Sequence, residues 1–173
     1  LLNQRIIYNM GKIKFTKGEL KRQRDSLKQF ERYLPTLQLK KQQLQLEILH
    51  QVAILEEKNK ILERKLFEEQ SWAGLLSDPE VKIGSFLRIF KINTHTVNIA
   101  GADIEVFENA AFENMEYDLF SSPLWLDLGI VALREIIALE EEVGYIKKGI
   151  AILRQELSIT TQRVNLFEKV KIP

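Results

Sequence analysis

The feature that most constrains the fold of this chain is a heptad pattern of apolar residues near its C-terminal end. The apolar side chains are spaced alternately by three and four residues, and only Thr160 interrupts the series. A mean spacing of 3.5 residues is typical of the contact face of a coiled-coil helix, which a single helix cannot bury by itself. The pattern therefore requires a partner element. Its members are Ile136, Leu139, Val143, Ile146, Ile150, Leu153, Leu157, Val164 and Phe167.

A second heptad pattern, between Leu27 and Leu66, places the expected partner in the same chain. Ten of its twelve positions are apolar, and Lys41 and Asn59 are the exceptions. A buried asparagine fixes the register of a coiled coil at a cost in stability, whereas a helix face that turns briefly to solvent explains the exceptions equally well. The two patterns together predict a pair of long helices.

The first long helix is predicted over residues 16–70. Thr16 precedes it and Glu19 follows three residues later, which is the pattern of a capping box. Pro35 falls inside the helix, where a proline removes one backbone hydrogen bond and clashes with the preceding turn. Because the apolar pattern continues on both sides of Pro35, we expect a helix that is kinked there but continuous.

Residues 71–121 are predicted to form a middle lobe that contains a β-hairpin at about 86–108. The sequence Ser-Asp-Pro at 77–79 is a turn signal that ends the first helix. Residues 86–99 are rich in β-branched and aromatic side chains, 100–103 predict a turn, and 104–107 predict a short second strand. An isolated hairpin is marginally stable in water, so this one must pack on the helices or on a partner.

The last helix is predicted over residues 122–172. Ser121 and Ser122 precede Pro123, a sequence that favours a serine N-cap and a proline at the first helical position. Because the middle lobe returns the chain, two helices of roughly 70 to 80 Å should pair antiparallel. The predicted fold class is all-α: one elongated domain, 1–173, built as a long antiparallel two-helix coiled coil with a small middle lobe containing a short β-hairpin. We expect this lobe at one end of the helices.

Charge and composition exclude several classes of function. The 25 basic and 24 acidic residues leave a net charge of +1, so no strong field favours nucleic acid or a membrane surface. The chain has no cysteine and hence no disulfide, thiolate metal site or cysteine nucleophile. The most apolar run, 124–139, contains charged residues and is shorter than the roughly 20 residues that span a bilayer.

Catalytic constellations are hard to find in the sequence. His50 and His95 lack the spacing of metal ligands, and we interpret both as structural or exposed. None of the eight glycines belongs to a phosphate-binding loop or a dinucleotide fingerprint. The run Glu140-Glu141-Glu142 is most simply a solvated helix face. We therefore predict no catalytic, cofactor-binding or metal-binding residues.

A basic cluster near the N-terminal end offers a possible phosphate-binding surface. Few aromatic residues are interleaved with it, and the C-terminal half does not repeat the bias. A charged helix surface is the favoured interpretation, and nucleic acid is not an expected partner. The cluster consists of Lys12, Lys14, Lys17, Lys21, Arg22, Arg24 and Lys28.

Two glycines and two tryptophans are also unusual for their positions. Gly144 and Gly149 each cost about 1 kcal/mol relative to alanine inside the last helix, and close approach of a partner is slightly favoured over tolerated weakness. Trp72 and Trp125 flank the middle lobe. We expect them to pack the lobe against the helices, with an exposed binding role as the minority interpretation.

The C-terminal residues resemble the signature of the D subunit of V-type (vacuolar or archaeal type) rotary ATPases. That family typically reads Arg-Val-Asn-Ala-Leu-Glu, two residues, then Val or Leu, Ile and Pro, and residues 163–173 read Arg-Val-Asn-Leu-Phe-Glu-Lys-Val-Lys-Ile-Pro. Three further stretches agree in the right order: 16–44 resembles the family's first helix, 98–101 the turn of its hairpin, and 122–127 a bacterial motif. Leu34-Pro35-Thr36 also resembles the bacterial branch. The family usually continues past this motif, whereas the sequence ends at Pro173.

The resemblance implies a non-catalytic central-stalk subunit, the rotor shaft of a V-type ATPase or ATP synthase. In that family the paired helices enter a head of catalytic and non-catalytic nucleotide-binding subunits. The middle portion meets the small F subunit of the stalk and the subunit that caps the membrane rotor ring. Such a shaft binds no cofactor and is cytoplasmic, peripheral to the membrane without inserting into it. Its rotation couples ATP hydrolysis or synthesis to transport of protons or sodium ions.

A stand-alone coiled-coil adaptor or tether is the alternative function. Its helices would only separate two binding ends, and it would be functional without ATPase subunits. A rotor subunit instead co-purifies with the catalytic head and the F subunit. An enzyme is a distant third, because no set of acid, base, nucleophile or metal ligands is visible.

Overall fold

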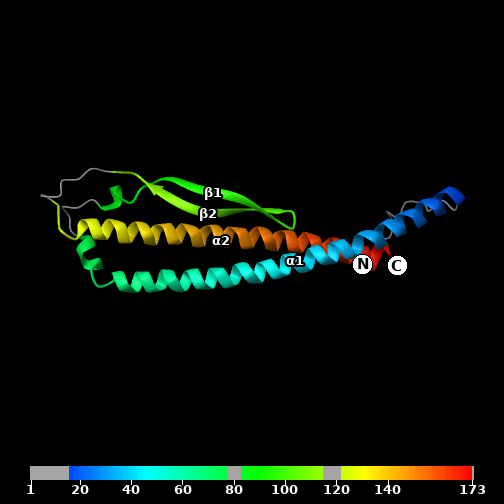
Figure 1. Ribbon diagram of the computed structural model, residues 1–173. Helices are drawn as coiled ribbons and strands as arrows, with labels where there is room; N and C mark the ends of the chain where they lie inside the picture. Colours follow the sequence, from blue (N-terminus) through cyan, green and yellow to red (C-terminus); the bar gives the residue numbers. More distant parts are fainter. Residues whose placement is uncertain (1–15, 78–82, 115–121, 173) are drawn as a thin grey trace, which may run out of the picture. The chain divides into compact units, whose positions relative to one another are not determined.

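The computed structural model describes residues 16–77, 83–114 and 122–172, which Figure 1 colours along the chain. The predicted cap Ser121, the turn residues Asp78 and Pro79, and the basic residues Lys12 and Lys14 lie outside this part. The chain divides into two compact units, residues 1–40 with 160–173 and residues 41–159. One elongated domain over 1–173 stays a prediction.

Helix α1 is Lys17–Glu69, close to the predicted bounds of the first long helix. The backbone N–H of Glu19 donates to Oγ1 of Thr16 at 3.2 Å, so Thr16 is the N-cap that the sequence predicts. The Glu19 carboxylate accepts a hydrogen bond from the Gln23 side chain at 2.9 Å. The helix also runs through Pro35 without interruption, as expected, while a kink there stays a prediction.

Strands β1 (Ile89–Ile99) and β2 (Ala102–Phe112) form one antiparallel hairpin. The predicted second strand, 104–107, is too short, because β2 has 11 residues. The predicted turn at 100–103 is too long, because Ala102 and Asp103 already pair with β1.

Two residues suffice for this turn because of their backbone conformation. Ala100 and Gly101 have φ values of 50° and 83°, both in the left-handed region, which is the requirement of a type I′ turn. The side-chain oxygen of Asn98 accepts a hydrogen bond from the Gly101 N–H at 3.1 Å. The glycine and this asparagine together fix the hairpin's register.

Helix α2 is Leu126–Leu166, and a π-helical turn, Phe167–Lys171, follows it. The helix begins later than predicted. Pro123 precedes it, and the carbonyl of Pro123 accepts a hydrogen bond from the N–H of Leu126 at 3.0 Å. None of the helices in residues 16–77, 83–114 and 122–172 is apolar over a stretch long enough to cross a membrane.

The two heptad patterns mark the faces that the structure covers. Along α2 every position of the pattern is buried or half-buried, and Thr160, the one polar member, is 1% exposed. Along α1 the pattern is at least half-buried except at Leu66, which is exposed. Lys41 and Asn59 are half-buried, so the face does not turn fully to solvent there. This burial is compatible with a coiled coil.

In the unit 41–159 the hairpin lies along α2, rather than forming a lobe at one end of the helices as expected (Figure 1). A buried cluster joins all three elements: Leu44 from α1, Ala102 and Ile104 from β2, and Leu153 from α2. The hairpin therefore shares the burial of the α2 heptad face with α1. Half-buried members surround this cluster: Ile48, Val97, Ile99, Ala100 and Leu157.

The other unit contains the beginning of α1 and the end of α2. The rings of Phe30 and Phe167 pack with their centroids 5.0 Å apart. The side-chain amide of Gln38 donates to the Glu168 carboxylate at 2.5 Å. Both partners near the C-terminal end belong to the π-helical turn, so this turn is held by one aromatic and one polar contact.

Candidate functional site: a helix pair that carries a hairpin

Two ion pairs connect α1 and α2 in the unit 41–159. Lys58 Nζ lies 2.8 and 2.9 Å from the two carboxylate oxygens of Glu142, and Lys65 pairs with Glu135. As the number rises along α1 it falls along α2, so the helices are antiparallel, as predicted. Glu142 is half-buried, which corrects its interpretation as part of a solvated face. The Lys58–Glu142 pair is partly buried and supports this register of the two helices, whereas the Lys65–Glu135 pair is exposed and contributes little.

The hairpin approaches α2 closely at Gly149. A Cβ built on this glycine would lie 3.8 Å from both Cβ and Cδ1 of Ile104, and Gly149 itself is buried. The close partner that the sequence predicts at Gly149 is therefore the hairpin of the same chain. At Gly144 a Cβ would meet nothing within 4 Å among the described residues, so the same prediction has no support there.

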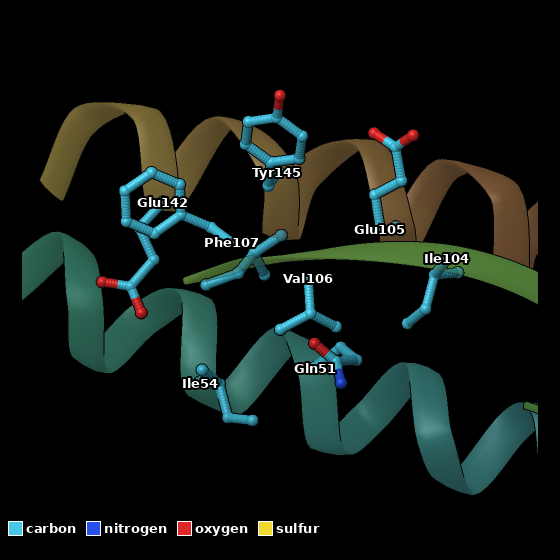
Figure 2. A pocket seen from close by; sticks show the side chains of 10 residues that line it. Gln51, Ile54, Ile104, Glu105, Val106, Phe107, Glu142 and Tyr145 are labelled. Carbon is cyan, nitrogen blue, oxygen red and sulfur yellow. The ribbon is translucent and has the colours of Figure 1, made fainter. Parts of the chain in front are cut away.

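A small cavity of about 160 Å³ lies between β2 and the two helices (Figure 2). In Figure 2, Ile104 and Val106 extend from β2 toward α1, whereas the carboxylate of Glu105 and the hydroxyl of Tyr145 point away. The wall on α1 includes Ile54. An apolar space of this size is a gap in packing, and its lining holds no pair of groups arranged for acid–base chemistry.

Arg134 anchors the base of the hairpin to α2. Its Nε and Nη2 donate to the carbonyl oxygen of Phe86 at 3.0 and 2.8 Å, and Nη2 also donates to the carbonyl of Glu113 at 2.8 Å. The guanidinium carbon lies 5.2 Å from the centroid of the Phe112 ring. Sequence reasoning treated Arg134 only as a charge that interrupts an apolar run. The charged pair Arg134-Glu135 among apolar residues was the available signal.

The two tryptophans pack on each other where α1 ends and α2 begins. Their ring centroids are 6.5 Å apart, and the Trp72 indole N–H donates to the Glu69 carboxylate. A Cβ on Gly129 would lie 3.1 Å from the Trp125 ring, so the absence of a side chain at this position makes room for the pair. The described contacts of the two tryptophans are with each other and with residues of α1 and α2, so their expected role in packing the middle lobe against the helices stays a prediction.

The remaining predicted candidates do not converge on a site. His50 is exposed on α1, and His95 Nδ1 lies 2.9 Å from a Glu108 carboxylate oxygen, with both side chains about half exposed. Within the described residues, no three His, Asp or Glu side chains are grouped so that they could hold a metal ion. The described members of the basic cluster are all exposed on α1: Lys17, Lys21, Arg22, Arg24 and Lys28.

Fold and contacts thus define a class of protein: an antiparallel pair of long helices that carries a hairpin along one member. The contacts described in this structure are interhelical ion pairs, a core shared by three elements and packed aromatic residues. Contacts of these kinds suit mechanical and binding roles.

Comparisons with known proteins identify the family. The family described as the ATP synthase D subunit matches residues 19–173. The chain is 44% identical over 165 residues to the V-type ATP synthase D subunit of Borreliella burgdorferi, covering 95% of this chain and 81% of the relative. It is 31% identical over 163 residues to the protein of the same name from Chlamydia pneumoniae, covering 93% and 78%. The chain belongs to the family of ATP synthase D subunits.

Proposed function

We propose that this chain is the non-catalytic central-stalk subunit, or rotor shaft, of a V-type ATPase or ATP synthase. The observation that carries the proposal is the family match over residues 19–173. In this role the chain turns inside a head of catalytic and non-catalytic nucleotide-binding subunits. It meets the small F subunit of the stalk and the subunit that caps the membrane rotor ring, and it is peripheral to the membrane.

A shaft must resist twisting and bending, and the contacts of the unit 41–159 support that role. Ion pairs and a buried cluster keep the two helices from sliding past each other. The linked pair therefore resists bending and twisting better than one helix alone would. We propose that the two heptad faces wind around each other as a coiled coil, which distributes torque over many small contacts. The mixed charge, with a net value of +1, leaves no single field to hold the shaft in one orientation.

Reconstitution with the cognate catalytic head tests this function. We expect the chain to form a complex with the head and with the F subunit, and ATP hydrolysis by the head to depend on its presence. In vesicles that hold the complete complex, hydrolysis should drive ion uptake only when the chain is included. Identical ATP turnover with and without the chain, together with no complex formation, would contradict the proposal.

A further inference from the structure

An exposed apolar surface surrounds the tryptophan pair, where α1 ends and α2 begins. We call this surface the tryptophan patch and define it by Trp72, Trp125, Leu124, Leu128 and Val131. The last three side chains are 98%, 77% and 58% exposed. They follow each other at steps of four and three residues, so those of α2 form a ridge along one helix face.

A groove of about 530 Å³ runs beside this ridge. Its walls are the two tryptophans and the α2 residues Leu128 and Val131, and Gly129 and Ala132 leave its floor low. Large exposed apolar residues that are contiguous, rather than scattered singly, mark interaction sites on soluble proteins. Tryptophan is also among the residues most enriched in the energetically dominant contacts of protein interfaces.

The charges around the groove restrict the chemistry of the partner. Both ionisable residues that line it are glutamates, Glu69 and Glu135. Lys65 already pairs with Glu135, whereas the Glu69 carboxylate accepts only the neutral indole N–H of Trp72 among the contacts given for the described residues. An acidic edge repels phosphates and anionic lipids and attracts lysine or arginine.

We propose that the tryptophan patch is a docking surface for a partner protein whose contact face is an apolar ridge with a lysine or arginine beside it. The partner's apolar side chains fill the groove along Leu128 and Val131, and its cation pairs with Glu69. This inference rests on the proposed function, since it assigns one part of the chain to one contact within the ATP synthase complex. A second copy of this chain, nucleic acid and lipid are the occupants that it excludes.

The experiment measures binding of this chain to each of the other soluble subunits of the cognate complex. These subunits are purified separately. The test variant is Leu128→Asp. Its matched control is Phe90→Asp, since Phe90 on β1 is 75% exposed and does not belong to the patch. We expect one subunit to bind the wild type and Phe90→Asp equally and Leu128→Asp about tenfold or more weakly. Melting curves confirm that the variants are folded.

Two further measurements separate a docked partner from an indirect effect. Glu69→Gln keeps an acceptor for the Trp72 indole but removes the charge, so it should weaken binding several-fold and flatten its salt dependence. Because the chain has two tryptophans, labelling with 5-fluorotryptophan gives two ¹⁹F resonances. Both resonances should shift when the partner binds the wild type, and at partner concentrations near the wild-type Kd the shifts should be several-fold smaller with Leu128→Asp.

The outcomes distinguish the two proposals. If the wild type binds none of the subunits, the proposed function fails, and this inference fails with it. If the chain binds its partners but Leu128→Asp and Glu69→Gln leave every affinity unchanged, only the docking surface is refuted. Loss in Leu128→Asp of self-association alone, or of binding to vesicles of phosphatidylcholine and phosphatidylserine alone, also refutes it, since a second copy or a membrane would then be the occupant.

Discussion

Gly129 and Gly144 lie in the same helix but have different surroundings. A Cβ at Gly129 would press on the Trp125 ring at 3.1 Å, whereas a Cβ at Gly144 would meet nothing within 4 Å. The helix-propensity cost of glycine is similar at both positions. Packing therefore decides how each one responds to alanine.

Alanine substitutions at these two glycines should have different effects. Gly144→Ala should raise the free energy of unfolding by about 0.5 to 1 kcal/mol, because alanine restricts the unfolded chain and fits the helix. Gly129→Ala should be less stable than Gly144→Ala by about 1 kcal/mol or more, because the tryptophan pair must move. Urea unfolding measures both values, and near-UV circular dichroism should change with Gly129→Ala only. Equal stabilities and unchanged spectra would show that the tryptophan rings adapt freely.

At the scale of secondary-structure elements, the hairpin depends on its two-residue turn. Gly101 has a φ of 83°, a conformation that costs a residue with a side chain about 1 to 2 kcal/mol. Gly84, in the short 3₁₀ helix Ile83–Ser85, has open space around it and no left-handed backbone. The two glycines therefore form a matched pair for a test of backbone strain.

Gly101→Ala should destabilise the chain by about 1 to 2 kcal/mol, because the turn requires a left-handed residue at this position. Gly84→Ala should stay within about 0.5 kcal/mol of the wild type. Thermal unfolding followed by far-UV circular dichroism gives both differences. If Gly101→Ala were no less stable than Gly84→Ala, the type I′ turn would not contribute to stability.

The buried face of α2 gives a second prediction for an element. Ile150 is 5% exposed, and Ile152, two residues later on the same helix, is 41% exposed. Ile150→Asp should lower the free energy of unfolding by about 3 kcal/mol or more, because a carboxylate would enter an apolar environment. Ile152→Asp should cost about 1 kcal/mol or less. Urea titrations compare the two variants, and similar midpoints would mean that the heptad face does not control stability.

At the scale of the whole molecule, the contact between the hairpin and α2 can be locked covalently. The Cβ of Ile104 lies 3.8 Å from the position of a Cβ on Gly149, which is the usual separation in a disulfide. The chain has no cysteine of its own, so an introduced pair cannot form other bonds within it. Gly144 offers a control position without such a neighbour.

The double variant Ile104→Cys/Gly149→Cys should oxidise to a disulfide under mild conditions, whereas Ile104→Cys/Gly144→Cys should not. Closing a loop of roughly 45 residues stabilises the oxidised form over the reduced form by up to about 4 kcal/mol. Non-reducing electrophoresis and melting curves with and without reductant measure this. In the reconstituted complex the oxidised chain should support the same ATP hydrolysis as the reduced chain. A loss on oxidation alone would show that the hairpin must leave α2 during turnover.

Local sequence patterns were enough to predict the long helices, the Thr16 cap, the continuity of α1 through Pro35 and the existence of a hairpin. Heptad spacing, capping and turn chemistry are local properties, so a short stretch of sequence carries them completely. The C-terminal motif and the three further stretches that carried the family resemblance are also continuous pieces of sequence. The predicted heptad face was right in position, since it matches the buried face of α2.

Such patterns could not predict where the hairpin lies or which element packs on each helix face. The hairpin lies along α2 because Arg134 reaches the carbonyls of Phe86 and Glu113, and because Ile104 fits against Gly149. These partners are far apart in sequence, and their match is one of shape and hydrogen-bonding geometry rather than of periodicity. For the same reason the sequence did not predict the packing of the tryptophan pair against Gly129. Which side chains lie beside a glycine is known only once the tertiary structure places them.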